Sequence, residues 1–323
     1  MALEANNSLD LTNAQALRDY VEDYNNVLIE QMFSGFDSAE YSTAHDGIKG
    51  KRYFTTMKVG KLVKRWSKKF NPDSGTLGFS PRPLEVDKVK LELEIYPQDF
   101  ETSYLGRYRQ KGQGMDIPFE GQIMNSVMNK LGQEIEFGFW NAKPSATPSE
   151  SDFLADTTRG ILYHLLEMIA SADVTVVGTP GGAVTVDNLL DLLDTMYKAY
   201  GTAYKKGVKT FLCSPEIAQL YFAAQKKKYP YDPVTSQTNA NGLIMYKLLT
   251  GTSWLVPLPG MSGSSRIILA DKDDLHYGMD SFLDINSFNV ERYERYYKFW
   301  LDFDFGTQII IPEPAAMVVN DLV

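Results

Sequence analysis

Apolar residues recur every three or four positions in five stretches of the chain, the spacing of one face of a helix. In the second stretch, Ile123, Val127, Leu131 and Ile135 form such a stripe. The fourth is the most complete, because Thr185 is placed to cap it and Gly201 to end it. The predicted helices span residues 11–34, 117–139, 153–172 and 185–200, and the fifth opens at Ser214-Pro215-Glu216.

Two other stretches alternate in hydrophobicity with a period of two, which predicts strands with one buried face. Residues 88–95 alternate lysine or glutamate with valine, leucine or isoleucine. Residues 297–305 alternate in the same way, Gly306 is expected to break the run, and residues 307–311 are expected to resume it. Shorter strands are predicted at residues 174–177, 208–213, 253–257, 266–270 and 316–319. Helices and strands mix without a regular βαβ repeat, so the predicted fold class is α+β.

The segment 47–100 has an ambiguous pattern. Val59, Leu62, Val63, Trp66 and Phe70 fit one face of a short helix, but residues 53–59 also fit a strand. Residues 71–75 read Asn-Pro-Asp-Ser-Gly, a turn signal, and residues 75–83 are rich in glycine and proline. We expect an extended, two-armed projection with a glycine-rich tip, closed by the strand at 88–95.

Composition narrows the class of protein. The chain has 323 residues, of which 44% are hydrophobic and 23% charged, as in ordinary globular proteins. Its single cysteine, Cys213, excludes an intramolecular disulfide and a thiolate metal cluster. The first residues do not form a secretory signal, and no apolar run is long enough to span a bilayer. The predicted location is a reducing, aqueous compartment, with no membrane partner.

The net charge of −9 is unevenly distributed. Residues 47–72 contain nine bases and no acid, which leaves 23 bases against 41 acids, or −18, elsewhere. Such a basic arm on an acidic body suits either a nucleic acid or a second copy of the same body, and a merely solvated loop is the alternative. The arm's bases are Lys49, Lys51, Arg52, Lys58, Lys61, Lys64, Arg65, Lys68 and Lys69.

An acidic stretch provides a candidate receptor for this arm. Residues 271–304 contain nine acids and four bases, so they suit a basic arm from another subunit. The candidate receptor patch is Asp271, Asp273, Asp274, Glu291 and Glu294.

Catalytic and cofactor motifs are not found in the sequence. The three histidines, His45, His164 and His276, lack a second histidine at metal-ligand spacing. Asp271, Asp273 and Asp274 match no calcium loop, so an acidic turn is the preferred interpretation. Cys213 precedes a predicted helix, where a thiolate can be stabilised, but a buried structural cysteine is more common. We therefore expect no catalytic residue, no cofactor and no metal site, and a non-enzymatic role.

The order of elements resembles the major capsid proteins of tailed bacteriophages, which share the Hong Kong phage-type capsid fold with encapsulins. The residues that carry this resemblance are VTVDNLLDLLDTMYKAY with GVKTFLCSPEIAQLY, SGSSRIILADKDDLHYGMD, and FWLDFDFGTQIIIPEPAAMVV. The first two are similar to the axial lobe and to the strand and turn that leave it. The third is similar to the closing strands of the peripheral lobe.

The resemblance implies a division of the chain and a set of partners. It implies an N-terminal arm (1–46), an extended basic loop (47–115), a peripheral domain with a spine helix (116–184), an axial domain (185–285) and closing strands (286–323). The resemblance also implies that the loop lies across a neighbouring subunit and that the axial lobe points at the symmetry axes. The implied partners are further copies in pentamers and hexamers, a portal, separate scaffolding or decoration proteins, and non-specifically packaged double-stranded DNA. Assembly in the host cytoplasm and residence in the virion follow.

Two other functions stay open from the residues. An encapsulin-like protein compartment shares the fold and differs in its cargo. A soluble hydrolase, which belongs to a different class, predicts a deep pocket with a perturbed carboxylate or a reactive Cys213.

Overall fold

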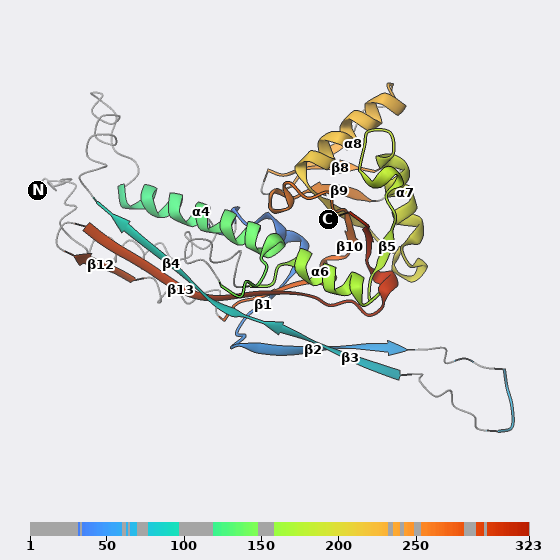
Figure 1. Cartoon of the computed structure of the whole chain (residues 1–323), viewed down its shortest axis with the longest axis horizontal. Coiled ribbons are helices and arrows are strands. Elements are labelled where there is room, and N and C mark those ends of the chain that lie inside the picture. Colours follow the sequence, from blue (N-terminus) through green and yellow to red (C-terminus); the bar gives the residue numbers. More distant parts are fainter. Residues whose placement is uncertain are drawn as a thin grey trace, which may run out of the picture.

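The described part of the computed structural model contains three sheets, and one of them, a long two-stranded ribbon, extends away from the body of the molecule (Figure 1). The structure describes residues 32, 34–59, 63, 65–69, 77–96, 119–147, 158–231, 235–239, 242–248, 253–280, 289–293 and 296–322.

The first sheet is built around one long strand, β13 (Tyr296–Ile309). On the body side β13 pairs with β11 (Leu275–Gly278), which pairs in parallel with β1 (Thr43–His45). Along its outer part β13 pairs with β12 (Asn289–Tyr293) and β4 (Asp87–Ile95). The alternation in sequence explains this pairing: Val89, Phe299 and Leu301 are buried, while the charged residues Lys88, Lys90 and Asp302 are exposed.

Two helices share a core with this sheet. They are α4 (Phe119–Asn141) and α6 (Ile161–Ala170). The apolar stripe of α4 places Met128, Leu131, Ile135 and Phe139 in that core, which also contains Phe305. The C-terminal half of the long helix and the long strand therefore contribute to one core.

The second sheet has seven short strands and lies between two cores. Leu212, Val256 and Ile268 belong to the core that contains α4 and β13, and their neighbours along the strands, Phe211, Leu255 and Leu269, belong to a second core. Its order is β5 (Thr175–Val177), β14 (Val318–Asn320), β10 (Ile268–Ala270), β6 (Thr210–Cys213), β9 (Trp254–Pro257), β8 (Ile244–Lys247) and β7 (Ser236–Thr238). Two helices, α7 (Leu189–Ala199) and α8 (Pro215–Lys228), pack with it. The short 3-10 turns are η1 (Asp37–Tyr41), η2 (Pro180–Gly182), η3 (Thr202–Tyr204), η4 (Pro259–Met261), η5 (Lys272–Asp274) and η7 (Pro314–Ala316).

The third sheet is the ribbon itself, made of β2 (Lys51–Val59) and β3 (Leu77–Glu85). Nine residue pairs connect the two strands, from Lys51 opposite Glu85 to Val59 opposite Leu77. After Glu85 the chain leaves β2 and continues as β4 alongside β13. Two short stretches therefore join the ribbon to the body: residues 46–50 connect β1 to β2, and Val86 connects β3 to β4.

Most of the predicted elements are confirmed, with shifted ends. The α+β class, the strand at 88–95 and the helices at 117–139 and 215 onward all occur in the structure. The helix expected at 185–200 begins at Leu189, because the Asn188 side chain accepts the N–H of Thr185 and donates to the carbonyls of Pro180 and Ala183. The helix expected at 153–172 spans Ile161–Ala170 in the described part. The predicted helix at 11–34 falls almost wholly outside the described residues.

The prediction that Gly306 breaks the last strand is wrong. β13 runs through Gly306 without interruption, and the β3–β4 chain crosses it at that point. A Cβ atom on Gly306 would lie 1.9 Å from the Glu85 carbonyl oxygen. Glycine is therefore needed for the close approach of two backbones, not for a turn.

We expect Gly306→Ala to lower the free energy of unfolding by about 1–3 kcal/mol, the usual cost of overpacking a close contact. The matched control is Gly178→Ala, whose nearest contact would be an ordinary 3.8 Å to Asp321 Oδ2. Thermal unfolding of the two variants tests this expectation. Equal melting temperatures would contradict the claim that the crossing of the two backbones requires glycine at position 306.

Candidate functional site

The ribbon is the candidate functional site because one of its faces is exposed to solvent. That face carries apolar side chains, which are not typical of a loop that is merely solvated. Sequence reasoning left residues 53–59 open between strand and helix, and the strand is observed. Residues 75–83 were expected to be a glycine- and proline-rich tip, but β3 begins at Leu77. Pro81 and Pro83 fit this strand because they occupy alternate positions, so both nitrogens face the open edge of the ribbon.

The two faces of the ribbon differ in chemistry. Residues directly opposite each other in an antiparallel pair lie on the same face. One face has Tyr53 opposite Pro83, Thr55 opposite Pro81 and Met57 opposite Phe79. Tyr53, Met57 and Phe79 are 63%, 53% and 66% exposed. We call Tyr53, Thr55, Met57, Phe79 and Pro81 the apolar face of the ribbon.

The opposite face carries polar residues and turns toward the body at its root. Phe54, Thr56 and Arg82 are partly buried there, and Leu84 is fully buried. Leu84 belongs to a small core with Ile48 and Val86, against which Phe54 packs. A two-stranded hairpin is at best marginally stable in water, so this root core is what the single chain contributes to holding the ribbon.

Polar contacts reinforce the root. Gln308 Nε2 of β13 donates to the Pro83 carbonyl at 2.6 Å. Arg82 pairs with Asp173, which follows α6, at 3.0 Å. Glu85 pairs with Lys51 and lies 4.0 Å from Arg159, and these cations hold the pKa of the Glu85 carboxyl below its ordinary value. The ribbon is fixed at one end and exposed along the rest of its described length.

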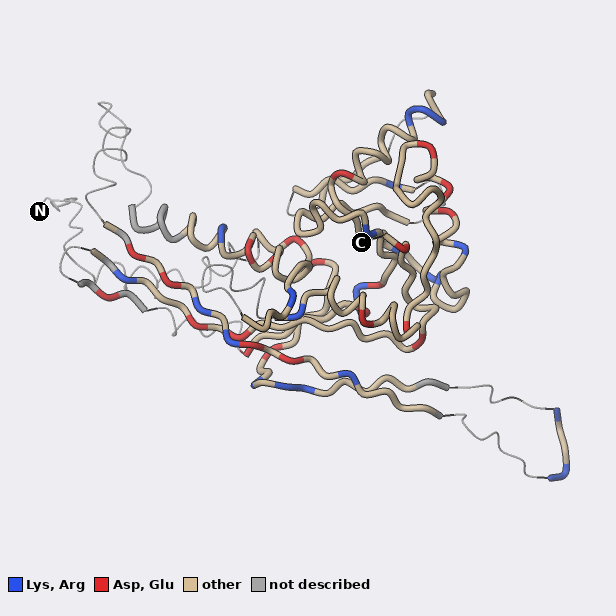
Figure 2. Tube along the Cα trace, viewed as in Figure 1, with Lys and Arg blue, Asp and Glu red and all other residues tan. Residues whose placement is uncertain are grey.

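The basic residues of the arm are spread over root and tip. Lys49, Lys51, Arg52, Arg65, Lys68 and Lys69 are exposed, and Figure 2 shows bases at both ends. Lys51 is paired with Glu85, and the Arg52 guanidinium lies 5.2 Å above the Phe54 ring. The structure does not describe the side chains of Lys58, Lys61 and Lys64. Residues 63 and 65–69 are not helical, so the alternative of a short basic helix is not observed in the described part of the arm.

The predicted acidic receptor residues fall in two separate places. Asp273 and Asp274 lie in the turn η5 before β11, and Asp271 caps that turn, whereas Glu291 lies on β12 opposite Lys298. Gln308, which lies opposite His276 of β11, is ten positions along β13 from Lys298, or about 30 Å at the usual rise. Glu294 lies outside the described residues.

Two of the three turn acids are already engaged within the chain. Asp271 pairs with the buried Lys209. Asp274 accepts the N–H of Asp271, and burial raises the pKa of its carboxyl to about 7. Asp273 is exposed. Asp271 and Asp274 therefore serve the fold, and their charges are not simply available to a partner.

Sequence reasoning missed a buried carboxylate on α4. Glu136 is 2% exposed and lies beside the apolar stripe. Its carboxylate accepts the Ser38 N–H at 2.8 Å, the Ser38 hydroxyl at 2.8 Å and the Gly260 N–H at 3.2 Å. Trp140 Nε1 donates to Ser38 Oγ at 2.6 Å, so the Ser38 proton is directed at Glu136. Glu136 thus joins η1, which precedes the ribbon, to η4 of the seven-stranded part.

Burial disfavours the charged form of the Glu136 side chain. Desolvation raises the pKa of Glu136 to about 7, although three donors face it. The sequence signal for this burial is the position of Glu136: it directly follows Ile135, within a stripe of apolar residues that recur every three or four positions.

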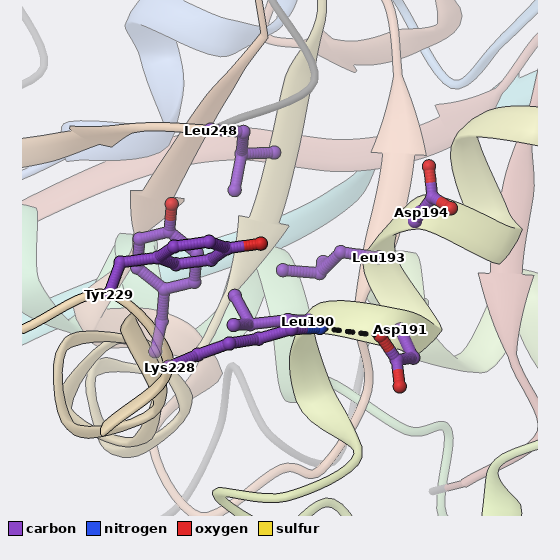
Figure 3. Close-up of a pocket in the computed structure, with 8 residues that line it drawn as sticks. Leu190, Asp191, Leu193, Asp194, Lys228, Tyr229 and Leu248 are labelled. Carbon is purple, nitrogen blue, oxygen red and sulfur yellow. Dashed lines mark hydrogen bonds and ion pairs between the residues drawn. The ribbon is translucent and has the colours of Figure 1, made fainter. Parts of the chain in front are cut away.

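The remaining candidates do not form a catalytic arrangement in the described residues. Burial raises the pKa of the Cys213 thiol, which favours the structural cysteine over the reactive one. Between α7 and α8 lies a cavity of about 220 Å³, shown in Figure 3. Its wall combines leucines, two tyrosines and the ion pair Lys228–Asp191 at 3.0 Å. The described lining holds no histidine, serine or cysteine next to these groups.

The described residues hold no group of three or more histidine, cysteine, aspartate or glutamate side chains placed to bind a metal ion. No described helix combines the length and the hydropathy needed to cross a bilayer.

Comparison with known proteins places the chain among capsid proteins. The family model described as "SU10 major capsid protein" matches residues 98–279, more than half of the chain. No curated protein sequence matches it.

Solved structures agree in fold. A chain of the satellite phage P4 procapsid, which includes the size determination protein Sid, has a TM-score of 0.56 at 13% identity, covering 92% of this chain and 98% of that one. A chain of the native GTA particle capsid has a TM-score of 0.54 at 11% identity, with 89% of each chain covered. A chain of the capsid of Myoviridae phage XM1 has a TM-score of 0.52 at 11% identity, covering 87% and 89%. At these identities the likeness is one of fold.

The buried carboxyl of Glu136 predicts how the free energy of unfolding depends on pH. Because the folded pKa of about 7 lies above the unfolded value of 4.5, the contribution of Glu136 to stability is full below pH 4.5 and is lost as the pH rises through 7. We expect the free energy of unfolding of the wild type to fall by about 3 kcal/mol more than that of Glu136→Gln over this range. Glu134→Gln, an exposed neighbour on the same helix, is the control and should follow the wild type. Parallel curves for wild type and Glu136→Gln would contradict the assignment.

Proposed function

This chain belongs to the SU10 major capsid protein family, and from that premise we propose that it assembles through pentamers and hexamers into an icosahedral shell around double-stranded DNA. It is a structural protein of the virion with the Hong Kong phage-type capsid fold. Family membership favours this shell over the nanocompartment and the hydrolase that the residues alone left open. Assembly in the host cytoplasm, together with a portal and separate scaffolding or decoration proteins, belongs to the same proposal.

The proposed division of the chain is supported by its separate cores. The extended loop (47–115) includes the ribbon, whose root has a core of its own. The peripheral domain (116–184), the closing strands (286–323) and one face of the axial sheet contribute residues to the largest core, whereas the axial domain (185–285) supplies most of the second. Residues 1–46 remain the proposed N-terminal arm.

The single observation that carries the mechanism is the exposed apolar face of the ribbon. Contiguous exposed apolar residues mark interaction surfaces, and a second copy is the partner that a capsid protein always meets. Burying one large apolar side chain contributes about 1.5–3 kcal/mol, whereas an exposed ion pair contributes about 0–1 kcal/mol. We therefore propose that the apolar face supplies most of the contact energy between copies. The basic tip then steers the approach toward the acidic body of a neighbour.

Removing apolar surface from the ribbon should prevent assembly without unfolding the chain. We expect Met57→Ser with Phe79→Ser to abolish shells at every concentration, because both side chains are exposed within the single chain. Phe137→Ser with Val208→Ser removes exposed apolar surface from the body and is the matched control. Light scattering after size exclusion, followed by negative-stain imaging, reports assembly, and circular dichroism reports folding. Normal shells from the ribbon variant would refute the apolar contact.

Reversing the charge of the tip should have a smaller, salt-dependent effect. We expect Arg65→Glu, Lys68→Glu and Lys69→Glu together to raise the concentration needed for assembly several-fold at low salt, and less in high salt, where charges are screened. The control carries the same charge change on the body, at Lys143, Lys206 and Lys226. If the triple variant assembles at low salt as readily as the wild type, the basic tip does not act in the encounter between copies.

A further inference from the structure

Two histidines that are far apart in sequence meet at the root of the ribbon. His45 ends β1 and His276 lies in β11, and the parallel pairing of these strands brings the two residues together. His45 Nε2 lies 2.8 Å from His276 Nδ1, and the rings are stacked with centroids 5.0 Å apart. Phe54 of β2 packs on both, at 4.5 Å from His45 and 5.8 Å from His276. The ribbon, the strand that leads into it and the body therefore meet at one imidazole pair.

The pair accommodates one proton between the facing nitrogens but not two. In the neutral pair, one imidazole donates and the other accepts. One additional proton is tolerated, because an imidazolium can still donate to a neutral partner. A second additional proton leaves two N–H groups facing each other between two positive charges, and the contact must then open.

The surrounding groups mostly oppose protonation. Burial lowers the pKa of His45, and Arg52 of β2 lowers it further by adding a third positive charge beside that imidazole. For His276, burial and His45 lower the pKa to about 4, and Asp273 of η5 acts against them. Across the sheet, the neighbours of His276 are the uncharged Thr43 and Gln308. In the described structure His276 Nε2 is buried without a hydrogen-bond partner.

We propose that this histidine pair is an acid-sensitive hinge. When both imidazoles are protonated, β1 and the root of the ribbon separate from β11, and the ribbon is free to change its angle to the body. The hinge is a property of the single chain, so it stands or falls independently of the proposed contact between copies.

Three other titrating groups nearby do not mimic this behaviour between pH 7.5 and 5. Glu85 keeps its charge, because its ion pairs hold its pKa below the ordinary value of 4.5. Glu136 and Asp274 become protonated in this range, but the raised pKa of each means that protonation stabilises the folded state around η1 and η5. A loss of protection at β1 and β11 on acidification therefore has the sign of the histidine pair.

Hydrogen–deuterium exchange on the unassembled full-length chain tests the hinge. After correction for intrinsic exchange, we expect residues 43–48 and 275–279 of the wild type to exchange on the order of tenfold faster at pH 5 than at pH 7.5. The strand Thr210–Cys213 serves as the internal reference and should not change.

The variants keep a hydrogen bond while removing the charge. His45→Gln places an amide where Nε2 was, and His276→Asn places one where Nδ1 was, so the double variant should lose the pH response. His164→Gln removes the third histidine, which lies 2.9 Å from the Thr307 carbonyl oxygen, and should respond like the wild type. If the double variant does not fold, His45→Gln alone should still reduce the response. An unchanged response in the histidine-pair variants, or none in the wild type, would overturn the hinge.

Discussion

A two-stranded ribbon cannot bury both of its faces, and this constraint governs the rest of the structure. β2 and β3 satisfy each other's backbone hydrogen bonds, but one face leaves Tyr53, Met57 and Phe79 in water. An isolated chain gains nothing from holding them there, because exposed apolar surface is a cost that only a covering surface removes. The ribbon is therefore informative about assembly: its stability is completed by something outside the chain, and family membership makes another copy the natural cover.

Such a ribbon is useful only if its root is rigid, and the structure concentrates its tightest packing there. Gly306 lets the β3–β4 chain cross β13 at backbone contact, and Leu84 closes a small core beside it. Glu136 fixes η1, the turn that leads into β1, to the spine of the body. A buried carboxylate and an imidazole pair are costly ways to hold a chain, and both make the attachment depend on pH, in opposite directions. The direction of the ribbon is thus set by a few polar contacts on a packed base.

The sequence predicted the elements whose patterns are local. The alternation at 88–95 and the stripe from Ile123 to Ile135 were sufficient to predict β4 and α4, because the burial of one face sets the spacing of the apolar residues. Features that depend on distant residues were missed. In the sequence, Gly306 is typical of a strand break, and only the structure shows that it allows the close approach of the Glu85 backbone. Pro81 and Pro83 are likewise typical of a loop, and only the structure shows that they lie on the open edge of the ribbon. His45 and His276 are 231 residues apart, so spacing rules had no means of pairing them. The acidic stretch 271–304 was grouped by charge alone, although β13 carries its parts to different ends of the sheet.

The most direct test of this account is electron cryo-microscopy of the assembled particle at a resolution that shows side chains. We predict that Tyr53, Met57 and Phe79 are covered by an adjacent copy of the chain, with the basic tip beyond them over an acidic part of that neighbour. A particle in which these three side chains face solvent, or lie only against their own chain, would contradict the central claim.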